Sequence, residues 1–345
     1  MTLSTRWLTP DCFQDYIAFT QQIYPQRRHV AERFRVQVLD NPFLHDKTRP
    51  VVLLACTETG GIVGHYGLSP VRFHLGGSQQ EGFSGFDFLV LPEHRQGGVG
   101  RELAATALSH EPYFGIGATP VAEHIYLKLG ATTVGHMHRF FWLRGPVQLL
   151  YLAGEMALGR AWPRQPESVG DRARLPVQVT AQGVTWTRQT RWPEWQDAAW
   201  SPQVISFSRS AQFLTYRFLE HPQHYHLYAA ASGDAYFVAR RYPWRGLALL
   251  CLADYRLPPQ DGAALDALLA AAKRLARAGR FDGVVVYSSL HFVDARLRAG
   301  GFRRMGQPTI VVAKGDLPLD AARIAARDYV FVTLADCDQD FAIFD

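Results

Sequence analysis

The sequence has few cysteines and no run of apolar residues long enough to cross a membrane. Its most apolar stretch, residues 147–158, is about half as long as a spanning helix must be and contains Glu155. We therefore expect an amphipathic helix there and no membrane partner. The N-terminus lacks a basic segment followed by an apolar one, so a signal peptide is not predicted and the protein is expected to be cytoplasmic.

The cysteines form no C-x-x-C pair and lie far apart in the chain. This spacing excludes a disulfide framework and predicts free thiols in a reducing compartment. The cysteines are Cys12, Cys56, Cys251 and Cys337.

Charge is not concentrated in one place, and several familiar catalytic signatures are missing. The formal net charge is +5, but no block of five or more like charges occurs, so a nucleic-acid partner is not predicted. The G-x-S-x-G elbow of serine hydrolases and the phosphate-binding P-loop are both absent. What remains is a chain of 345 residues, 48% of them hydrophobic, which is typical of a globular protein with two domains.

Strands and helices alternate in the first half of the chain. Apolar runs at 50–56 and 61–68 flank a turn that contains glycine, which indicates a hairpin, and residues 85–91 read as a third strand. Residues 101–110 have the composition of a helix and residues 113–117 that of a short strand. This alternation predicts an α/β fold with a mixed sheet, of the α+β kind.

Two short patterns recur in the same order in the second half. The LDNP of residues 39–42 is echoed by the LEHP of residues 219–222, and Gly130-Ala131 is echoed by Gly301-Phe302. The echoes indicate either two copies of one fold or chance similarity. A stretch rich in proline and charge, residues 163–176, is the predicted linker. The predicted parts are residues 1–145, a helix and linker at 146–176, a second domain at 177–315 and a tail at 316–345.

The most informative segment is a glycine-rich bend, Arg95-Gln96-Gly97-Gly98-Val99-Gly100, which follows a strand ending in Val90-Leu91-Pro92. A strand that turns through glycines into a helix directs several backbone N–H groups at one point, where the helix dipole is positive. Such a site suits a pyrophosphate. The alternative is an ordinary strand-to-helix connection, and the spacing does not match a strict dinucleotide fingerprint.

This segment resembles the acyl-coenzyme A motif of the GNAT superfamily, the Gcn5-related N-acetyltransferases, which reads V-x-P and then R/Q-x-x-G-x-G/A. The resemblance covers residues 7–143 and extends to 180–313 as a degenerate copy, so it implies two GNAT-like domains in tandem. It also implies acetyl-CoA or another acyl-CoA as the donor, with the strand end holding pantetheine and the loop holding pyrophosphate. The implied cofactor-binding residues are Leu89, Val90, Leu91, Arg95, Gln96, Gly97, Gly98, Val99 and Gly100.

A second similarity to the family lies between Gly117 and Gly130. Threonine and proline at 119–120 predict a helix start and Gly130 its end. The resemblance implies that Tyr126, four residues before that glycine, protonates the departing thiolate of coenzyme A. The alternative is a tyrosine that packs into the core. The matching position in the second half is Leu297, which offers no phenol.

The amine that attacks a thioester must be neutral, so a base is needed. Asp87 is the preferred catalytic candidate because a carboxylate in the apolar strand 86–90 is costly unless it is paired or functional. A hydrogen-bonded structural aspartate is an equal alternative. A backbone N–H near Val90 is expected to stabilise the oxyanion. Further candidate bases are His94, Glu123 and His124.

Histidines and a basic turn are further candidate ligand sites. The cluster at 221–226 and the pair His136 and His138 lack the ligand spacing of metal sites, so no metal is predicted. Arg27-Arg28-His29 forms either a contact to an anionic acceptor or an exposed basic turn.

Together these features predict an acyl-CoA-dependent N-acyltransferase that transfers its acyl group directly in a ternary complex. The expected acceptor is a small-molecule primary amine, such as an amino sugar or a nucleotide-linked amino sugar, and the expected assembly is a monomer or homodimer. One alternative is a Fem-like aminoacyl transferase, which takes its acyl group from aminoacyl-tRNA. The other is a non-catalytic binding protein with the same fold.

Overall fold

The computed structural model describes residues 3–47, 51–150, 175–192, 197, 199–221 and 224–344. The strands of the first half are β1 (Leu3–Trp7), β2 (Val52–Thr57), β3 (Ile62–Leu75), β4 (Ser78–Val90), β5 (Tyr113–Ala118) and β6 (Thr132–Leu143). Its helices are η1 (Pro10–Cys12), α1 (Phe13–Ile23), α2 (Val30–Phe34), η2 (Arg35–Leu39), η3 (Pro92–Gly97), α3 (Val99–Leu108) and α4 (Pro120–Lys128).

The second half contains shorter strands and one long helix. Its strands are β7 (Gln178–Ala181), β8 (Val184–Gln189), β9 (Ile205–Phe207), β10 (Tyr225–Ala230), β11 (Tyr236–Trp244), β12 (Leu247–Arg256), β13 (Gly283–Ser288), β14 (Arg303–Arg304), β15 (Thr309–Lys314) and β16 (Val330–Phe331). Its helices are α7 (Ala211–Leu214), η4 (Thr215–Leu219), α8 (Gly262–Ala278), α9 (His291–Ala299), α10 (Ala321–Ala325), η5 (Leu334–Asp336) and η6 (Asp338–Phe344). The segments η2 and η4 are π-helical.

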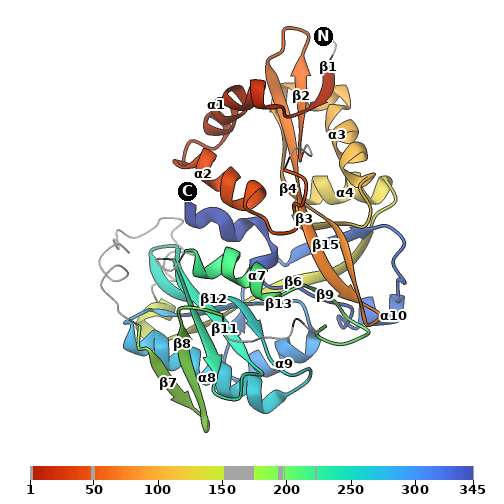
Figure 1. Ribbon diagram of the computed structural model, residues 1–345. Coiled ribbons are helices and arrows are strands. Elements are labelled where there is room, and N and C mark those ends of the chain that lie inside the picture. Colours follow the sequence, from red (N-terminus) through yellow and green to blue (C-terminus); the bar gives the residue numbers. More distant parts are fainter. Residues whose placement is uncertain are drawn as a thin grey trace.

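In the part of the chain described, 16 strands form one continuous sheet, whose main path is β1-β2-β3-β4-β5-β15-β6-β13-β12-β11-β10-β8-β7. Figure 1 shows α1 and α2 on one side of the first-half strands and α3 and α4 on the other, with the C-terminal segment between the halves. Parallel and antiparallel pairs both occur. The predicted mixed α/β fold is confirmed.

The two halves exchange strands at the centre of the sheet. Strand β15 comes from the second half but lies between β5 and β6, with Thr309 opposite Met137. The later part of β6 pairs with β13, where His138 lies opposite Ser288. Each half therefore completes the sheet of the other, and the two cores are joined by backbone hydrogen bonds as well as by side chains.

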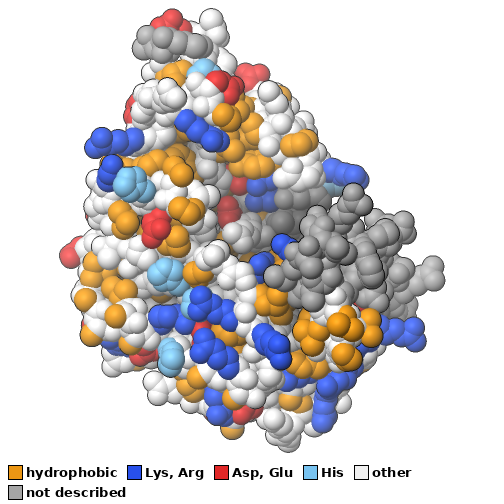
Figure 2. Space-filling view, turned by 180° about the vertical axis from the view of Figure 1, so that it is seen from behind, with side chains coloured by type: hydrophobic (Ala, Val, Ile, Leu, Met, Phe, Trp, Pro, Cys, Tyr) orange, Lys and Arg blue, Asp and Glu red, His pale blue; other side chains and the backbone are white. Residues whose placement is uncertain are grey.

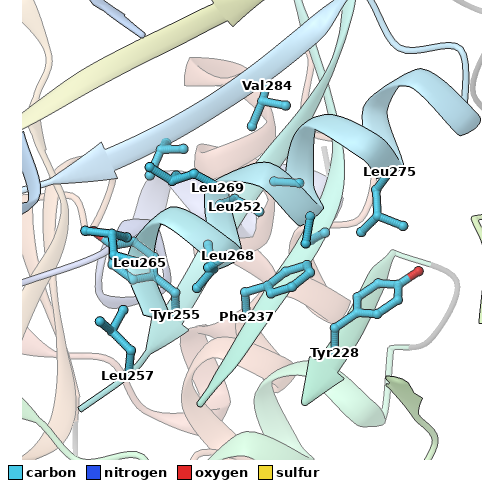
Figure 3. Packing of buried hydrophobic residues seen from close by; sticks show 14 of the residues in the cluster. Tyr228, Phe237, Leu252, Tyr255, Leu257, Leu265, Leu268, Leu269, Leu275 and Val284 are labelled. Atoms are coloured by element: carbon cyan, nitrogen blue, oxygen red, sulfur yellow. The ribbon is translucent and has the colours of Figure 1, made fainter. Parts of the chain in front are cut away.

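The largest core lies under α8 in the second half. Leucines at 265, 268, 269 and 275 share one face of the helix, as the spacing of an amphipathic helix requires, and all are buried. Figure 3 shows these leucines on the side of α8 that faces the strands, with Leu268 beside Phe237 of β11 and Leu275 beside Tyr228 of β10. Full burial of one leucine side chain stabilises a fold by about 1.5–3 kcal/mol, so this helix holds the second-half strands together.

Both halves contain the same order of local elements. A short α-helix runs into a π-helical turn twice, as α2 with η2 and as α7 with η4. The echoed tetrapeptides at 39–42 and 219–222 begin at the last residue of those two turns. A parallel strand pair joined by a helix then follows in each half, as β4-α3-β5 and as β12-α8-β13. The echoed tetrapeptides therefore hold the same place in the order of elements of each half.

Most predicted elements of the first half are found. The hairpin appears as β2 and β3, and the third strand as β4, which begins seven residues earlier than predicted because it continues a long hairpin with β3. Residues 146–150 are helical. The rest of the helix predicted at 147–158 and the linker predicted at 163–176 lie outside the described residues, apart from 175 and 176.

The length of the described helices and the side chains on one face of the molecule bear on possible partners. None of them is both long and apolar enough to span a bilayer. Figure 2 shows the face opposite to that of Figure 1, on which hydrophobic side chains lie between charged ones. Lys and Arg gather over its lower half, while acidic side chains are scattered.

Candidate functional site

The strands β4 and β5 lie side by side at their starts and separate at their ends. Their parallel pairing covers only residues 83–85 against 113–115. Beyond Gly85, β4 continues on β3 while β5 continues on β15. One edge of β4 at residues 86–90 therefore faces no other described strand. We call the opening between 86–90 and 116–118 the splayed cleft, and its backbone groups are open to a ligand.

The predicted glycine bend lies at the end of β4. Gly98 has a φ of 78°, a left-handed conformation that favours glycine, and α3 starts directly after it. The N–H groups of Arg101 and Glu102 both donate to the Gly98 carbonyl, at 2.9 and 3.2 Å. Within the described residues, no acceptor is recorded for the N–H groups of Gly98, Val99 and Gly100. Unpaired N–H groups at the positive end of a helix dipole form an anion site.

Packing inside the protein does not explain all three glycines of the bend. A Cβ added at Gly97 would approach no other group closer than 3.9 Å, and one at Gly98 would meet nothing within 4 Å. At Gly100 the nearest groups would be the side chains of Val90 at 3.6 Å and Phe88 at 3.8 Å. The space beside these amides is thus open, and it leads toward Phe88 in the splayed cleft.

The end of β4 presents one backbone N–H to the cleft. The Leu91 N–H donates to the Val63 carbonyl of β3 at 2.9 Å. Because backbone groups of a strand alternate between its two edges, the N–H of Val90 points to the opposite edge, which is the splayed cleft. The Arg95 Nε donates to the Val90 carbonyl at 2.9 Å on that side and fixes the strand end against the bend.

Tyr126 projects from α4 toward the splayed cleft. Thr119 caps this helix through its Oγ1, which accepts the Ala122 N–H at 3.3 Å, and Gly130 follows it with a φ of 86°, as predicted. The Tyr126 side chain is almost buried, with 4% of the residue exposed, and its hydroxyl accepts a hydrogen bond from Tyr66 at 2.7 Å. Burial raises the pKa of Tyr126 to about 12, partly offset by hydrogen bonding from its tyrosine neighbours.

Asp87 lies at an irregularity of β4. The register with β3 shifts between His65 and Gly67, and Asp87 has a φ of 47°, which is rare for a residue other than glycine. Its carboxylate receives two hydrogen bonds from Arg27, at 2.6 and 2.8 Å, and lies 4.0 Å from Arg33. Burial pushes the pKa of Asp87 up, but the hydrogen bond and charges of the two arginines outweigh it, so the pKa is below the ordinary value. Asp87 is a fixed negative charge.

A second carboxylate reaches the same place from the C-terminal tail. The Asp338 Oδ2 accepts the backbone N–H of Asp87 at 3.3 Å. Burial and the charge of Asp87 raise the pKa of Asp338. Sequence reasoning missed Asp338, because an acidic tail 251 residues away from Asp87 carries no local sign of where it folds back.

Two cavities meet at Asp338. The cleft cavity, of about 210 Å³, is lined by Tyr126, Asp87, Asp338 and residues 115–119 of β5 and the turn after it. The inter-half cavity, of about 60 Å³, lies between the first half, the second half and the tail. Both are lined by Gly85, Phe86 and Asp338. A group entering from either cavity therefore comes to the same carboxylate.

The chain matches no family model and no curated protein. It does match solved structures over about nine tenths of its length. A GCN5-related N-acetyltransferase from Anabaena variabilis shares 12% identity at a TM-score of 0.55, covering 90% of this chain and 72% of that one. A probable N-acyltransferase of unknown function from Enterococcus faecalis shares 10% identity at a TM-score of 0.56, with the same coverage. N-myristoyltransferase of Saccharomyces cerevisiae with bound myristoyl-CoA shares 11% identity at a TM-score of 0.52, and the match covers 90% of this chain and 82% of that one.

This chain has the GNAT fold. The confirmed element order explains why the glycine bend, the splayed cleft and Tyr126 come together, since all three follow from β4, β5 and the helices after them. Tyr126 and Asp87 line one cavity, and Phe88 links that cavity to the bend.

The other candidate bases lie elsewhere on this GNAT fold. Glu123 is half-buried and accepts the Thr133 hydroxyl at 3.0 Å, and His124 is exposed. His94 lies in η3, and none of the three lines the cleft cavity or the inter-half cavity. Arg27 is not part of an exposed turn, because its side chain is 10% exposed and pairs with Asp87.

One of the paired histidine candidates, His138, has a structural partner. His138 lies 3.0 Å from the Asp294 carboxylate, and His136 belongs to the same strand. Of the cluster at 221–226, residues 222 and 223 lie outside the described residues. Among the residues described, no three His, Cys, Asp or Glu side chains are grouped as metal ligands would be.

Proposed function

We propose that this protein is an acyl-CoA-dependent N-acyltransferase, with acetyl-CoA as the donor and a small-molecule primary amine as the acceptor. The observation that carries the proposal is the set of unpaired amides at Gly98, Val99 and Gly100, open toward a cleft that ends at a buried phenol. The fold supports it, because neighbours described as N-acetyltransferase and N-myristoyltransferase share it. We place the enzyme in the cytoplasm as a monomer or homodimer.

The first half supplies the donor site in this proposal. The amides of Gly98, Val99 and Gly100 hold the pyrophosphate, flanked by Arg95, Gln96 and Gly97. The open edge of Leu89, Val90 and Leu91 lies along the pantetheine arm. The Val90 N–H stabilises the oxyanion that acyl transfer creates, without any side chain. A donor placed this way has its thioester near Tyr126.

The second half is, we propose, a degenerate copy of the first. The helix α8 begins where α3 begins in the first half, but the Asp261 side chain already accepts the Ala264 N–H at 2.9 Å. Pro258 and Pro259, just before it, have no N–H at all. Leu297, at the position matching Tyr126, is fully buried in the core. Among its described residues, this half therefore has no unoccupied anion site at the start of α8 and no phenol at position 297.

The domain limits belong to the same proposal. We assign residues 1–145 to the donor domain, 146–176 to a helix and linker, 177–315 to the degenerate copy and 316–345 to the tail. The position of β15 between β5 and β6 means that the donor domain borrows one strand from the second copy.

Asp338 is the base in this proposal, with Asp87 as the charge that tunes it. Asp87 is held by two hydrogen bonds from Arg27, so it is a poor acceptor of another proton. The charge of Arg33 lowers the pKa of Asp338, but burial and the charge of Asp87 outweigh it, and Asp338 lines both cavities. A carboxylate with a raised pKa takes a proton from an ammonium group more readily than an ordinary one does.

The acceptor approaches, we propose, through the inter-half cavity. Its walls include the rings of Phe43, Phe213 and Tyr216, which suit the apolar faces of a ring. Its arginines are already ion-paired, Arg209 with Asp254 and Asp336 and Arg217 with Asp340. A small ring-bearing amine, such as an amino sugar, fits these walls better than a nucleotide-linked one, whose phosphates need unpaired cations.

Replacing Asp338 with asparagine should remove the acidic limb of the kcat profile against pH. In the wild type, kcat falls as pH drops through the pKa of Asp338, because the protonated carboxyl cannot take the ammonium proton. The kcat of the Asp338→Asn variant should be more than about tenfold below that of the wild type near neutral pH. The difference should shrink as the pH approaches the pKa of the amine, because the amine is then already neutral. The Asp87→Asn variant should keep the limb and move it to lower pH, since the neighbouring negative charge is gone. The reverse pattern would make Asp87 the base.

Replacing Gly100 with alanine should weaken acetyl-CoA binding while stabilising the protein. A Cβ at this helical position has ordinary contacts, and alanine in place of helical glycine stabilises by about 0.5–1 kcal/mol. The same Cβ narrows the space between the bend and Phe88, so we expect about tenfold weaker binding, or about 1.4 kcal/mol. Calorimetric titration with acetyl-CoA and thermal unfolding measure the two effects.

The matched control is Gly61→Ala at the β2–β3 turn, where an added Cβ would lie 3.4 Å from Thr57 and would meet no atom of the bend within 4 Å. It should leave acetyl-CoA affinity unchanged. Wild-type protein that shows no affinity for acetyl-CoA, or a Gly100→Ala variant that binds it equally well, removes the donor site from the proposal.

A Fem-like aminoacyl transferase is the second candidate, and one observation favours it. Lys and Arg gather over the lower half of the face in Figure 2, as a tRNA-binding surface requires. Incubation with amines and either acetyl-CoA or charged tRNA distinguishes the two enzymes. The acyl-CoA-dependent N-acyltransferase should consume only acetyl-CoA, and the Fem-like transferase only charged tRNA. A non-catalytic binding protein would bind acetyl-CoA but release no coenzyme A with any amine.

A further inference from the structure

Three tyrosine hydroxyls form a chain at the vertex of the splayed cleft. The Tyr66 hydroxyl is hydrogen-bonded to that of Tyr113, and it donates to Tyr126 at 2.7 Å. Gly85 and Gly115 are the last paired residues of β4 and β5 before these strands separate. All three tyrosines line the cleft cavity, and Tyr126, which comes from α4, is the most exposed of the three, at 4% against 1% for Tyr66 and 0% for Tyr113.

The number of protons fixes the direction of this chain. Each hydroxyl has one proton to donate. Because Tyr66 donates to Tyr126, the hydrogen bond between Tyr66 and Tyr113 must use the proton of Tyr113. The proton of Tyr126 is then left over, and no acceptor for it is recorded among the described residues. It is free to point into the cleft cavity.

The two inner tyrosines keep their protons more firmly than the outer one. Burial raises the pKa of Tyr66 and of Tyr113 well above the ordinary value, whereas the pKa of Tyr126 rises to about 12. Tyr66 therefore stays a donor when Tyr126 loses its proton. A hydrogen bond to a charged oxygen is stronger than one to a neutral hydroxyl, so the contact stabilises the phenolate more than the phenol.

One glycine on each of β4 and β5 leaves room for the row of tyrosine hydroxyls. A Cβ at Gly85 would collide with the hydroxyls of Tyr66, at 2.6 Å, and Tyr113. A Cβ at Gly115 would lie 3.2 Å from the Tyr113 hydroxyl and 3.4 Å from the Tyr126 ring. Phe88 stacks on Tyr66 from the cleft side, with ring centroids 4.5 Å apart. The hydroxyls are thus held in one arrangement by strand backbone and ring packing.

We propose that Tyr66 and Tyr113 are positioning residues that aim the proton of Tyr126 at the leaving sulfur and stabilise the phenolate that remains. The inference rests on the proposed acyl transfer. As the C–N bond forms and the C–S bond breaks, the electron pair goes to sulfur and the Tyr126 proton follows it. The proton that the attacking nitrogen loses then restores the Tyr126 hydroxyl, so no net charge is left on the tyrosines.

The test uses the whole protein with acetyl-CoA and hydroxylamine, a small nucleophile whose nitrogen is neutral at pH 7. We expect Tyr66→Phe to lower kcat about tenfold and to change KM for acetyl-CoA less than twofold, with a smaller loss for Tyr113→Phe. The deciding measurement is a double-mutant cycle. If Tyr66 acts through Tyr126, adding Tyr66→Phe to Tyr126→Phe should cost no further activity.

The control is Tyr255→Phe, which removes a buried hydroxyl that donates to the Tyr287 carbonyl at 3.0 Å in the second half. Its kcat should equal that of the wild type. Losses of Tyr66→Phe and Tyr126→Phe that multiply would assign Tyr66 a structural role only, and an unchanged kcat in Tyr66→Phe would also overturn the inference. By contrast, a wild type that releases no coenzyme A, or an unchanged kcat in Tyr126→Phe, would count against the proposed function.

Discussion

Replacing Tyr126 with phenylalanine should reduce kcat for acyl transfer by about 100-fold, the lower end of what a general acid contributes. The acetyl-CoA Kd should stay within twofold, because the proposed donor contacts come from the backbone amides of residues 98–100. The leaving thiolate then has to take its proton from water, which is not held in position. Steady-state release of coenzyme A, together with calorimetric titration, separates the two quantities.

Because phenylalanine has nearly the same shape as tyrosine, a loss of kcat in Tyr126→Phe can be assigned to the missing hydroxyl. Phenylalanine keeps the ring that packs against Tyr66 and Phe88 and removes only the hydroxyl. Tyr228→Phe is the matched control, because it deletes a hydroxyl that donates to the Pro176 carbonyl at 2.7 Å, away from both cavities. Equal losses in the two variants would show that general destabilisation, not proton transfer, limits turnover.

Replacing Asp340 with asparagine should lower the free energy of unfolding by about 3–5 kcal/mol, as breaking a buried ion pair does. Its carboxylate is fully buried and accepts from Arg217 at 2.6 Å, Arg240 at 2.6 Å and the Tyr225 hydroxyl at 2.8 Å. Both arginines are at most 5% exposed. Asparagine is neutral, so it leaves their charges without a counterion in the protein interior.

This ion-pair cluster also sets the position of the proposed base. Asp340 fixes η6 to β11 and η4, and Asp336 fixes the preceding turn to Arg209 at 2.6 Å. Asp338 lies between these two anchors and points to the first half. In the folded fraction of Asp340→Asn, we therefore also expect a lower kcat, with acetyl-CoA binding retained.

Urea unfolding measures the loss of stability, and Asp266→Asn is the control. That residue forms an ion pair with Arg296 at the same distance of 2.6 Å, but both side chains are about one third exposed. Exposed pairs contribute about 0–1 kcal/mol. If the two variants lose the same free energy, burial does not strengthen the Asp340 contacts and the tail is not anchored as described.

Several features of the site follow from short stretches of sequence, and these were predictable. The bend at 95–100 and the helix that carries Tyr126 are each made by neighbouring residues, through glycine conformation and a threonine cap. Local patterns of this kind predict structure reliably, because the interacting groups are neighbours in the chain and stay close in any fold. The three phenols are different, since Tyr66, Tyr113 and Tyr126 come from β3, β5 and α4 and carry no shared motif.

Asp87 shows how a correct signal can support an incomplete interpretation. A carboxylate in an apolar strand must be paired or functional, and the structure shows that it is paired, with Arg27. The arginine lies 60 residues earlier in the chain, within the turn for which sequence allowed either an acceptor contact or an exposed basic surface. Only the packing of α1 and α2 against β3 and β4 brings the two charges together.

By itself, the sequence determined the alternation of strands and helices, the conformation of the glycine bend and the place of Tyr126 on its helix, because each depends on interactions between residues close in the chain. The tertiary structure alone decided which carboxylates share a site, how β15 and β6 cross between the halves, and that Asp338 returns from the tail to Asp87. These depend on contacts between residues far apart, and their energies come from burial and from exclusion of water, which no local pattern encodes.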